Sequence, residues 1–288
     1  MIGIKEFNKK IGSLKNTRKM TKTMKMVSAS KFKRAHKAQM NAQVYADKLT
    51  GLISRLSQSN QAQHPLMRNK KNSHKILVLL FTSDKGLCGG FNNNLIRSLR
   101  RWITEKNITT DKIDMSCCGR RGHMAFRRSV NIKKVYEGIT LKPAFSDAAL
   151  VANDIAQAFL NSEYDEVYVA SNEFRGPLSQ VPVIKQVLPL NTDTIKTGAM
   201  VKAVDYVYEP QQAELFKFLL PKYLNFKIFF TLLENAAGEH GARMAAMDKA
   251  TQNTADLIDH YTLLRNRARQ ASITTELIEI ISGAEALK

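Results

Sequence analysis

The chain has 288 residues, of which 44% are hydrophobic, so it is long enough to bury one large core or two smaller ones. The longest uncharged apolar run, Ile76 to Phe81, is far shorter than the roughly 18 residues that a membrane-spanning helix needs. The N-terminus has no apolar signal-peptide core, so we do not expect export. Cys88, Cys117 and Cys118 are an odd count without metal-ligand spacing, which favours a reducing compartment. We interpret the vicinal pair Cys117–Cys118 as two buried small residues, with a redox switch as the alternative.

Positive charge is concentrated at the N-terminus. The net charge is +19, and residues 1–40 contain twelve Lys or Arg and one Glu. Such a block could bind nucleic acid, an anionic membrane or an acidic protein. Nucleic-acid binding by stacking needs aromatic residues among the bases, but here only Phe7 and Phe32 occur, both on the predicted apolar stripe. That stripe is too narrow for a membrane-surface helix, so we favour an acidic protein partner.

The two ends of the chain predict long helices, residues 1–60 and 210–288. In residues 3–59 there is no proline, and apolar or small side chains recur close to a 3.5-residue period. These side chains are Ile4, Phe7, Ile11, Leu14, Thr21, Ser28, Phe32 and Ala35. In the C-terminal region a short helix over Gln211–Leu220 is expected to end before Pro221, which would begin the long helix. A lone helix cannot bury its own stripe, so we expect the two ends to form an antiparallel coiled coil with a slim seam.

Residues 74–209 predict a separate α/β domain. Strands are expected at Lys75–Thr82, Lys112–Cys118, Val130–Tyr136 and Asp165–Ala170, with edge strands at Val181–Leu190 and Ala203–Tyr208. Helices are expected at Phe91–Lys106, Arg120–Arg128 and Ser146–Asn161, the last with Ser146 or Asp147 near its N-cap. Alternating strands and helices indicate a doubly wound domain, so the overall fold class is α/β with a terminal coiled coil.

The segment Ser83–Gly90 (SDKGLCGG) follows a strand and precedes a helix, where phosphate-binding loops occur. It matches neither GxxxxGK[ST] nor GxGxxG. We therefore interpret it as a strand–helix turn and predict no nucleotide or other cofactor. The six histidines are scattered without metal-ligand spacing, and no catalytic triad can be assembled. The sequence thus predicts no catalytic residue and no metal.

Four segments resemble the gamma subunit of F-type ATP synthase: Ile11–Lys31 (IGSLKNTRKMTKTMKMVSASK), Ser83–Leu95 (SDKGLCGGFNNNL), Glu239–Met247 (EHGARMAAM) and Arg267–Ala284 (RARQASITTELIEIISGA). They run nearly end to end, in the family's order and spacing. The resemblance implies a non-catalytic rotor shaft, with terminal helices inside a hexamer of alpha and beta subunits. It also implies contacts of the α/β domain with the epsilon subunit and the ring of c subunits.

The resemblance further implies which residues meet partners. Lys22, Lys25, Lys31 and Lys33 are candidate contacts for acidic loops of beta, and Met24 lies beside Lys25 where the shaft touches beta. Arg243, Gln270 and Thr274 match coupling positions of the C-terminal helix, and 278–287 would form the tip in an apolar sleeve. The chain lacks the chloroplast cysteine insert and a transit peptide. We therefore expect a bacterial protein without thiol control, peripheral on the cytoplasmic face of the inner membrane.

Two other classes remain open on the residues alone. One is a basic coiled-coil adaptor or nucleic-acid-binding protein, which predicts binding that weakens steeply with salt. The other is an α/β enzyme using the turn at 83–90, which predicts stabilisation by nucleotide or phosphate. The rotor interpretation involves no nucleic acid. It predicts neither salt-sensitive nucleic-acid binding nor stabilisation by nucleotide or phosphate.

Overall fold

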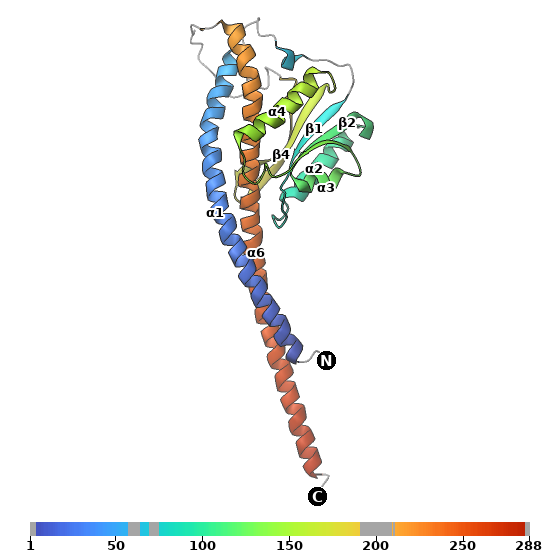
Figure 1. Ribbon diagram of the computed structural model, residues 1–288. Helices are drawn as coiled ribbons and strands as arrows, with labels where there is room; N and C mark the ends of the chain where they lie inside the picture. Colours follow the sequence, from blue (N-terminus) through green and yellow to red (C-terminus); the bar gives the residue numbers. More distant parts are fainter. Residues whose placement is uncertain (1–3, 57–63, 69–74, 191–208, 210, 286–288) are drawn as a thin grey trace. The chain divides into compact units, whose positions relative to one another are not determined.

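The computed structural model describes residues 4–56, 64–68, 75–190, 209 and 211–285. They form two compact units: a helical unit, from residues 1–28 and 244–288, and a sheet unit, from residues 29–243. The helices are α1 (Ile4–Leu56), η1 (Pro65–Met67), α2 (Phe91–Glu105), η2 (Thr110–Lys112), α3 (Arg120–Phe126), α4 (Phe145–Leu160) and α6 (Gln212–Glu285). The strands are β1 (Ile76–Phe81), β2 (Ile113–Cys118), β3 (Asn131–Tyr136), β4 (Glu166–Gly176) and β5 (Ser179–Leu188) (Figure 1). The domain boundaries expected near residues 60, 74 and 209 stay a prediction.

The terminal helices α1 and α6 are antiparallel. In the helical unit the Phe7 ring lies 6.4 Å from the Tyr261 ring, and Thr251 donates a hydrogen bond to Thr21 over 2.8 Å. Residues later in α1 therefore contact residues earlier in α6. The same direction holds inside the sheet unit, where the rings of Tyr45 and Phe226 lie 4.5 Å apart and Thr50, further along α1, is hydrogen-bonded to Tyr223, earlier in α6. No helix in the described part of the chain is both long and apolar enough to cross a membrane.

The seam between the helices of the helical unit is built from small and β-branched side chains. Ile11, Thr21 and Ser28 are buried there, as their 3.5-residue period predicts. On α6, Thr254 is buried and Thr262 half-buried, and each donates its hydroxyl to a carbonyl one turn back, over 2.6 and 2.7 Å. Hydroxyls bonded within their own helix can line an apolar seam without an unsatisfied donor.

Pro221 does not begin a new helix, contrary to the expectation. It lies inside the continuous helix α6. Proline within a helix removes one backbone hydrogen bond and disfavours the preceding turn. Here Phe216, Leu220 and Leu224 are almost fully buried on the flanking turns. Their burial, at about 1.5–3 kcal/mol per large apolar side chain, outweighs the local penalty and holds one helix through the proline.

The sheet has the order β3-β2-β1-β4-β5, so the chain winds outward in both directions from β1. Strands β1, β2, β3 and β4 are parallel, and β5 is antiparallel to β4. This confirms the doubly wound α/β prediction. Strand β1 is the centre of the sheet and is buried along nearly its whole length, as its continuous apolar sequence indicates.

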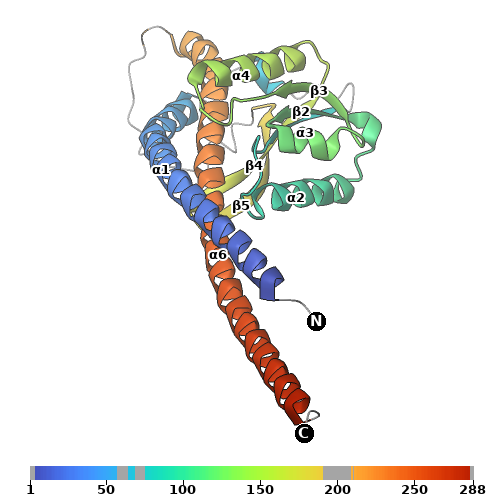
Figure 2. The same cartoon turned by 60° about the horizontal axis from the view of Figure 1, so that its bottom comes forward.

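Helices cover both faces of the sheet (Figure 2). Leu77, Leu79 and Phe81 of β1 join one core with α4 and the parts of α1 and α6 in the sheet unit. Val78 and Leu80 point to the opposite core, with α2 and α3. The alternation follows the two-residue period of a strand, so one apolar strand supplies both cores.

Two local predictions needed correction. Strand β4 continues to Gly176, beyond the expected end at Ala170, because it forms a hairpin with β5. Helix α4 begins at Phe145, with Ala144 at the N-cap position, so neither Ser146 nor Asp147 supplies a side-chain cap. Asp147 lies instead in the first turn, where a carboxylate interacts favourably with the helix dipole. The edge strand expected at 203–208 falls outside the described residues.

Candidate functional site

The basic sequence at the N-terminus forms an exposed surface of α1. Within residues 4–28 of the helical unit there are eight Lys or Arg and one acidic residue. Lys22 is exposed and makes no ion pair with a described residue. Met20, Met26 and Val27 are also more than half exposed and lie among these charges. Exposed apolar side chains within a charged surface are typical of protein-binding sites.

Met24 and Lys25 lie at the edge of the seam and are half-buried. Lys25 Nζ donates to Asp248 Oδ1 on α6 over 2.6 Å. Both side chains stay largely exposed, so this pair stabilises the unit by no more than about 1 kcal/mol. A carboxylate of a partner protein could therefore replace Asp248 at Lys25 with only a small loss of stability.

Lys31 and Lys33 belong to the sheet unit and are exposed on α1. Phe32, between them, faces inward, with its ring 5.5 Å from the His36 ring and 5.9 Å from the Phe174 ring. The aromatic contact fixes this turn of α1 against the β4–β5 hairpin. It leaves the two lysines on the outside.

Arg243 ties α6 to the turn after β1. Its Nε and Nη2 donate to the Gly86 carbonyl over 3.3 and 3.2 Å, and Nη2 also reaches the Lys85 carbonyl at 3.4 Å. The same nitrogen forms an ion pair of 2.5 Å with Glu239, whose side chain is completely buried. Arg243 itself is only 12% exposed. The structure thus joins two of the segments singled out in the sequence, SDKGLCGG and EHGAR.

The groups around Arg243 have perturbed pKa values. Burial raises the pKa of the Glu239 carboxyl, and the Arg243 guanidinium partly offsets this effect. Burial, with repulsion from Arg243 and Lys31, lowers the pKa of His240 to about 4. His240 is therefore neutral at neutral pH. Its Nδ1 lies 3.4 Å from the Arg243 guanidinium.

Gly241 allows the hairpin to approach α6 closely. A Cβ atom at this position would lie 3.0 Å from the Pro177 carbonyl oxygen and 3.1 Å from its Cα. Because both are backbone atoms, they cannot move aside cheaply. The glycine of EHGAR is therefore a packing requirement.

Ser83 and Asp84, in the turn at 83–90, bond within the protein. Asn92 accepts from the Ser83 N–H over 2.9 Å and donates to the Ser83 hydroxyl over 2.7 Å. Asp84 accepts from the Arg120 N–H and the Thr140 hydroxyl. No group of side chains in the described ranges could hold a metal ion. These contacts support the interpretation as a strand–helix turn.

All three thiols are buried and form no disulfide, and the burial of Cys117 and Cys118 was predicted. Burial raises the pKa of all three, that of Cys117 to about 12. They are therefore poor nucleophiles at neutral pH.

Gln270 and Thr274 lie on the part of α6 that extends past the start of α1. Both are exposed, and the Thr274 hydroxyl bonds back to the Gln270 carbonyl over 2.9 Å. The same segment exposes five large apolar side chains, 48–67% accessible: Ile273, Leu277, Ile278, Ile280 and Ile281. Exposed apolar stretches of this kind are typical of protein-binding surfaces.

Sequence reasoning gave no role to Glu239 and His240. The Glu239–Arg243 spacing of four residues, which places both on one helix face, was the available signal. Nothing local indicated that the pair would meet the turn at 83–90.

A family model described as ATP synthase matches residues 3–287. The ATP synthase gamma chain of Trichlorobacter lovleyi is 42% identical over 289 residues and is covered completely, as is this chain. The chain belongs to the ATP synthase gamma chain family. The gamma chains of Geobacter metallireducens and Anaeromyxobacter dehalogenans are 42% and 40% identical, also over both complete chains.

Two solved structures extend the gamma chain comparison. In the central stalk and c-ring structure of Tetrahymena thermophila mitochondrial ATP synthase, one chain is 25% identical with a TM-score of 0.60, covering 80% of this chain and 99% of that one. A chain of Euglena gracilis mitochondrial ATP synthase has a TM-score of 0.67 at 18% identity, over 99% and 94% of the two chains, and supports the fold. The predicted family and fold class are confirmed. The adaptor or nucleic-acid-binding alternative gains no support.

Proposed function

We propose that the chain is the central-stalk rotor of a bacterial ATP synthase, that it turns inside a hexamer of alpha and beta subunits, and that it catalyses no reaction itself. The observation that carries this proposal is the helical unit. It is a slim antiparallel pair whose α1 exposes bases and methionines, and whose α6 ends in an exposed apolar segment. The chain's membership of the gamma chain family supports the same role.

Rotation couples the shaft to ATP chemistry only if its contacts differ among the surrounding sites. The exposed lysines of α1 supply such contacts for acidic loops of beta, and the exposed Gln270 and Thr274 supply polar ones. The proposed contact set comprises Lys22, Met24, Lys25, Lys31, Lys33, Arg243, Gln270 and Thr274. Within it Arg243 acts differently, because its guanidinium already holds α6 to the turn at 83–90.

The sheet unit would meet the epsilon subunit and the ring of c subunits. The matched Tetrahymena structure is described as a central stalk with its c-ring. We place the chain at the cytoplasmic face of the inner membrane, held there through the complex.

Co-purification tests this proposal. A tagged full-length chain, expressed with the alpha and beta subunits, should recover both at physiological salt with ATPase activity. The tagged chain alone should show none. Recovery of nucleic acid without alpha or beta, or ATPase activity in the chain alone, would refute the proposal.

A further inference from the structure

Helix α6 covers the position at which doubly wound sheets bind their ligands. The strand order reverses between β1 and β4, and ligands of such sheets bind outside the carboxyl ends of the strands at that switch point. Here the Asn235 amide of α6 donates to the Thr82 carbonyl, directly after β1, over 3.5 Å. Three residues later a Cβ atom on Gly238 would lie 3.0 Å from the Phe91 ring and 3.3 Å from Gln180 of β5. The switch point is therefore filled by the chain's own helix.

Two side chains that α6 brings to the switch point are completely buried and lack a hydrogen-bond donor. Asn235 and Glu239 are each 0% exposed. Asn235 Oδ1 and Glu239 Oε2 accept no hydrogen bond from the part of the chain that the structure describes. The other Glu239 oxygen is paired with Arg243 over 2.5 Å, so the carboxylate is only half satisfied. Buried polar atoms are almost always hydrogen-bonded, so both oxygens need a donor.

The side-chain donors of the turn after β1 are already used. The Ser83 hydroxyl donates its one hydrogen to the Lys85 carbonyl over 2.5 Å, so the Cys88 thiol is the donor in the 3.8 Å contact between Ser83 and Cys88. The Asn92 amide donates to the Ser83 hydroxyl and to the Cys88 sulfur. None of these hydrogens can reach the buried oxygens of α6 without giving up an existing bond.

Reversing the Asn235 amide does not solve the problem. Its oxygen would then face the Thr82 carbonyl oxygen at 3.5 Å, where two acceptors repel each other. The Arg243 guanidinium is also committed, because it donates to the other oxygen of Glu239 and to the carbonyls of the turn. The missing donor must therefore come from outside the chain.

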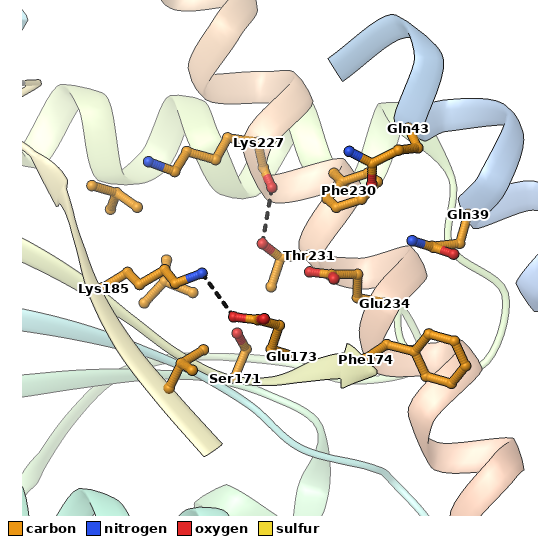
Figure 3. Close-up of a pocket in the computed structure, with 13 residues that line it drawn as sticks. Gln39, Gln43, Ser171, Glu173, Phe174, Lys185, Lys227, Phe230, Thr231 and Glu234 are labelled. Atoms are coloured by element: carbon orange, nitrogen blue, oxygen red, sulfur yellow. Dashed lines mark hydrogen bonds and ion pairs between the residues drawn. The ribbon is translucent and has the colours of Figure 1, made fainter. Parts of the chain in front are cut away.

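The large cavity of the sheet unit is a separate space. It has a volume of about 440 Å³ and lies between α1, the β4–β5 hairpin and α6, where Gln39, Lys185 and Lys227 line it (Figure 3). Lys185 is paired there with Glu173 over 3.1 Å. Neither of the two buried side chains at the switch point lines this cavity. Its charged groups therefore do not supply the missing donors.

We propose that one water molecule is bound at the switch point and donates one hydrogen bond to Asn235 Oδ1 and the other to Glu239 Oε2. Side chains four residues apart on a helix have Cβ atoms about 5–6 Å apart, close to the distance of about 5 Å between two oxygens that one water bridges. Buried waters make about two to four hydrogen bonds of this kind. A metal cation fits worse, because the Arg243 guanidinium already neutralises Glu239.

A crystal structure of the full-length chain, at a resolution that shows ordered water, tests the proposal directly. We expect one density peak about 2.7–3.0 Å from both Asn235 Oδ1 and Glu239 Oε2. Two buried oxygens with no peak between them would overturn the proposal. A peak with about six oxygen ligands at roughly 2.4 Å would also overturn it, because such contacts identify a cation.

Carbon-13 NMR of the Glu239 carboxyl separates a bound water from a bound proton. A neutral Glu239 could donate its own hydrogen to Asn235 and would need no water. We expect the chemical shift of an ionised carboxylate at neutral pH, since Arg243 is paired with it. Glu239→Gln, which lacks this signal, assigns it. The shift of a protonated carboxyl at neutral pH would refute the water site.

Substitution of Asn235 gives a second readout. Asn235→Leu removes one acceptor of the water and should abolish the density peak. It should also raise the equilibrium constant for unfolding in urea at least about tenfold, because Glu239 Oε2 is left without a donor. Asn253→Leu, at an exposed position of α6, should leave that constant unchanged. If Asn235→Leu does not fold, Asn235→Ser should fold and keep the water, because it retains an acceptor. A peak that persists unchanged in Asn235→Leu would contradict the assignment.

Discussion

Replacing Arg243 with alanine should destabilise the sheet unit by about 3 kcal/mol. The Glu239 side chain is completely buried, its Oε1 lies 2.5 Å from the Arg243 guanidinium, and its Oε2 has no hydrogen-bond partner. The substitution therefore leaves a buried carboxylate without its cation, and breaking such a pair costs about 3–5 kcal/mol. The lower end applies, because Arg243 is 12% exposed and water can enter the space it leaves. The Gly86 carbonyl also loses its two donors.

A double-mutant cycle isolates the contribution of the Arg243–Glu239 ion pair to stability. Glu239→Gln removes the buried charge, so Arg243→Ala should cost about 2 kcal/mol less in that background. Urea unfolding followed by circular dichroism gives the free energies, and hydrogen exchange at the turn around Gly86 reports the local loosening. Arg269→Ala, at an exposed position of α6, is the matched control. A loss under about 1 kcal/mol, or additive effects of the two substitutions, would refute the argument.

Three further predictions follow from the same region and from α1. The contribution of His240 to stability should fall by about 2–3 kcal/mol as the pH drops from 6.5 to about 4, because the unfolded chain binds a proton that buried His240 excludes, whereas the raised pKa of Glu239 acts in the opposite direction. Urea titrations of His240→Gln should lack this part of the pH dependence, and an unchanged slope would count against it. Gly241→Ala should lower the free energy of unfolding by about 1–3 kcal/mol, since its Cβ would meet the Pro177 backbone; a neutral effect in thermal melts would show that the hairpin can shift. Met24→Lys should reduce protons pumped per ATP hydrolysed more than it reduces assembly, while Met26→Lys, an exposed change of the same kind, should have a smaller effect. Wild-type pumping per ATP by Met24→Lys would contradict the contact proposed there.

The features predicted correctly from the sequence are those set by short-range pattern. The 3.5-residue period placed Ile11, Thr21 and Ser28 on a buried seam, and all three are buried. The apolar run of β1 indicated a central strand for the same reason. Periodicity is a property of neighbouring residues, so it can be read without knowing the fold.

The features missed depend on residues far apart in the chain. Ser171 and Asn172 are polar, so they concealed the extension of β4, yet the sheet unit buries both. Pro221 was predicted to begin a helix, because local propensity takes no account of the burial of the turns on either side of it. Arg243 was named by resemblance, but its bond to Gly86 spans 157 residues and has no local signal. The cavity lined by Gln39, Lys185 and Lys227 has the same origin, since these residues come from α1, β5 and α6, far apart in the chain.

The threonines of the seam have a mechanical consequence. The hydroxyls of Thr254 and Thr262 are hydrogen-bonded within α6. The attraction between the two helices at these positions therefore comes mainly from dispersion between small side chains. Dispersion does not favour one rotation of a helix about its own axis, whereas a hydrogen bond across the seam fixes that rotation. Toward Thr262 each helix can therefore turn by a small angle about its own axis without breaking a bond, whereas the Thr21–Thr251 hydrogen bond and the Lys25–Asp248 ion pair restrain that rotation elsewhere in the unit. Resistance to twisting is therefore uneven along the seam: it is concentrated near the Thr21–Thr251 hydrogen bond and falls toward Thr262.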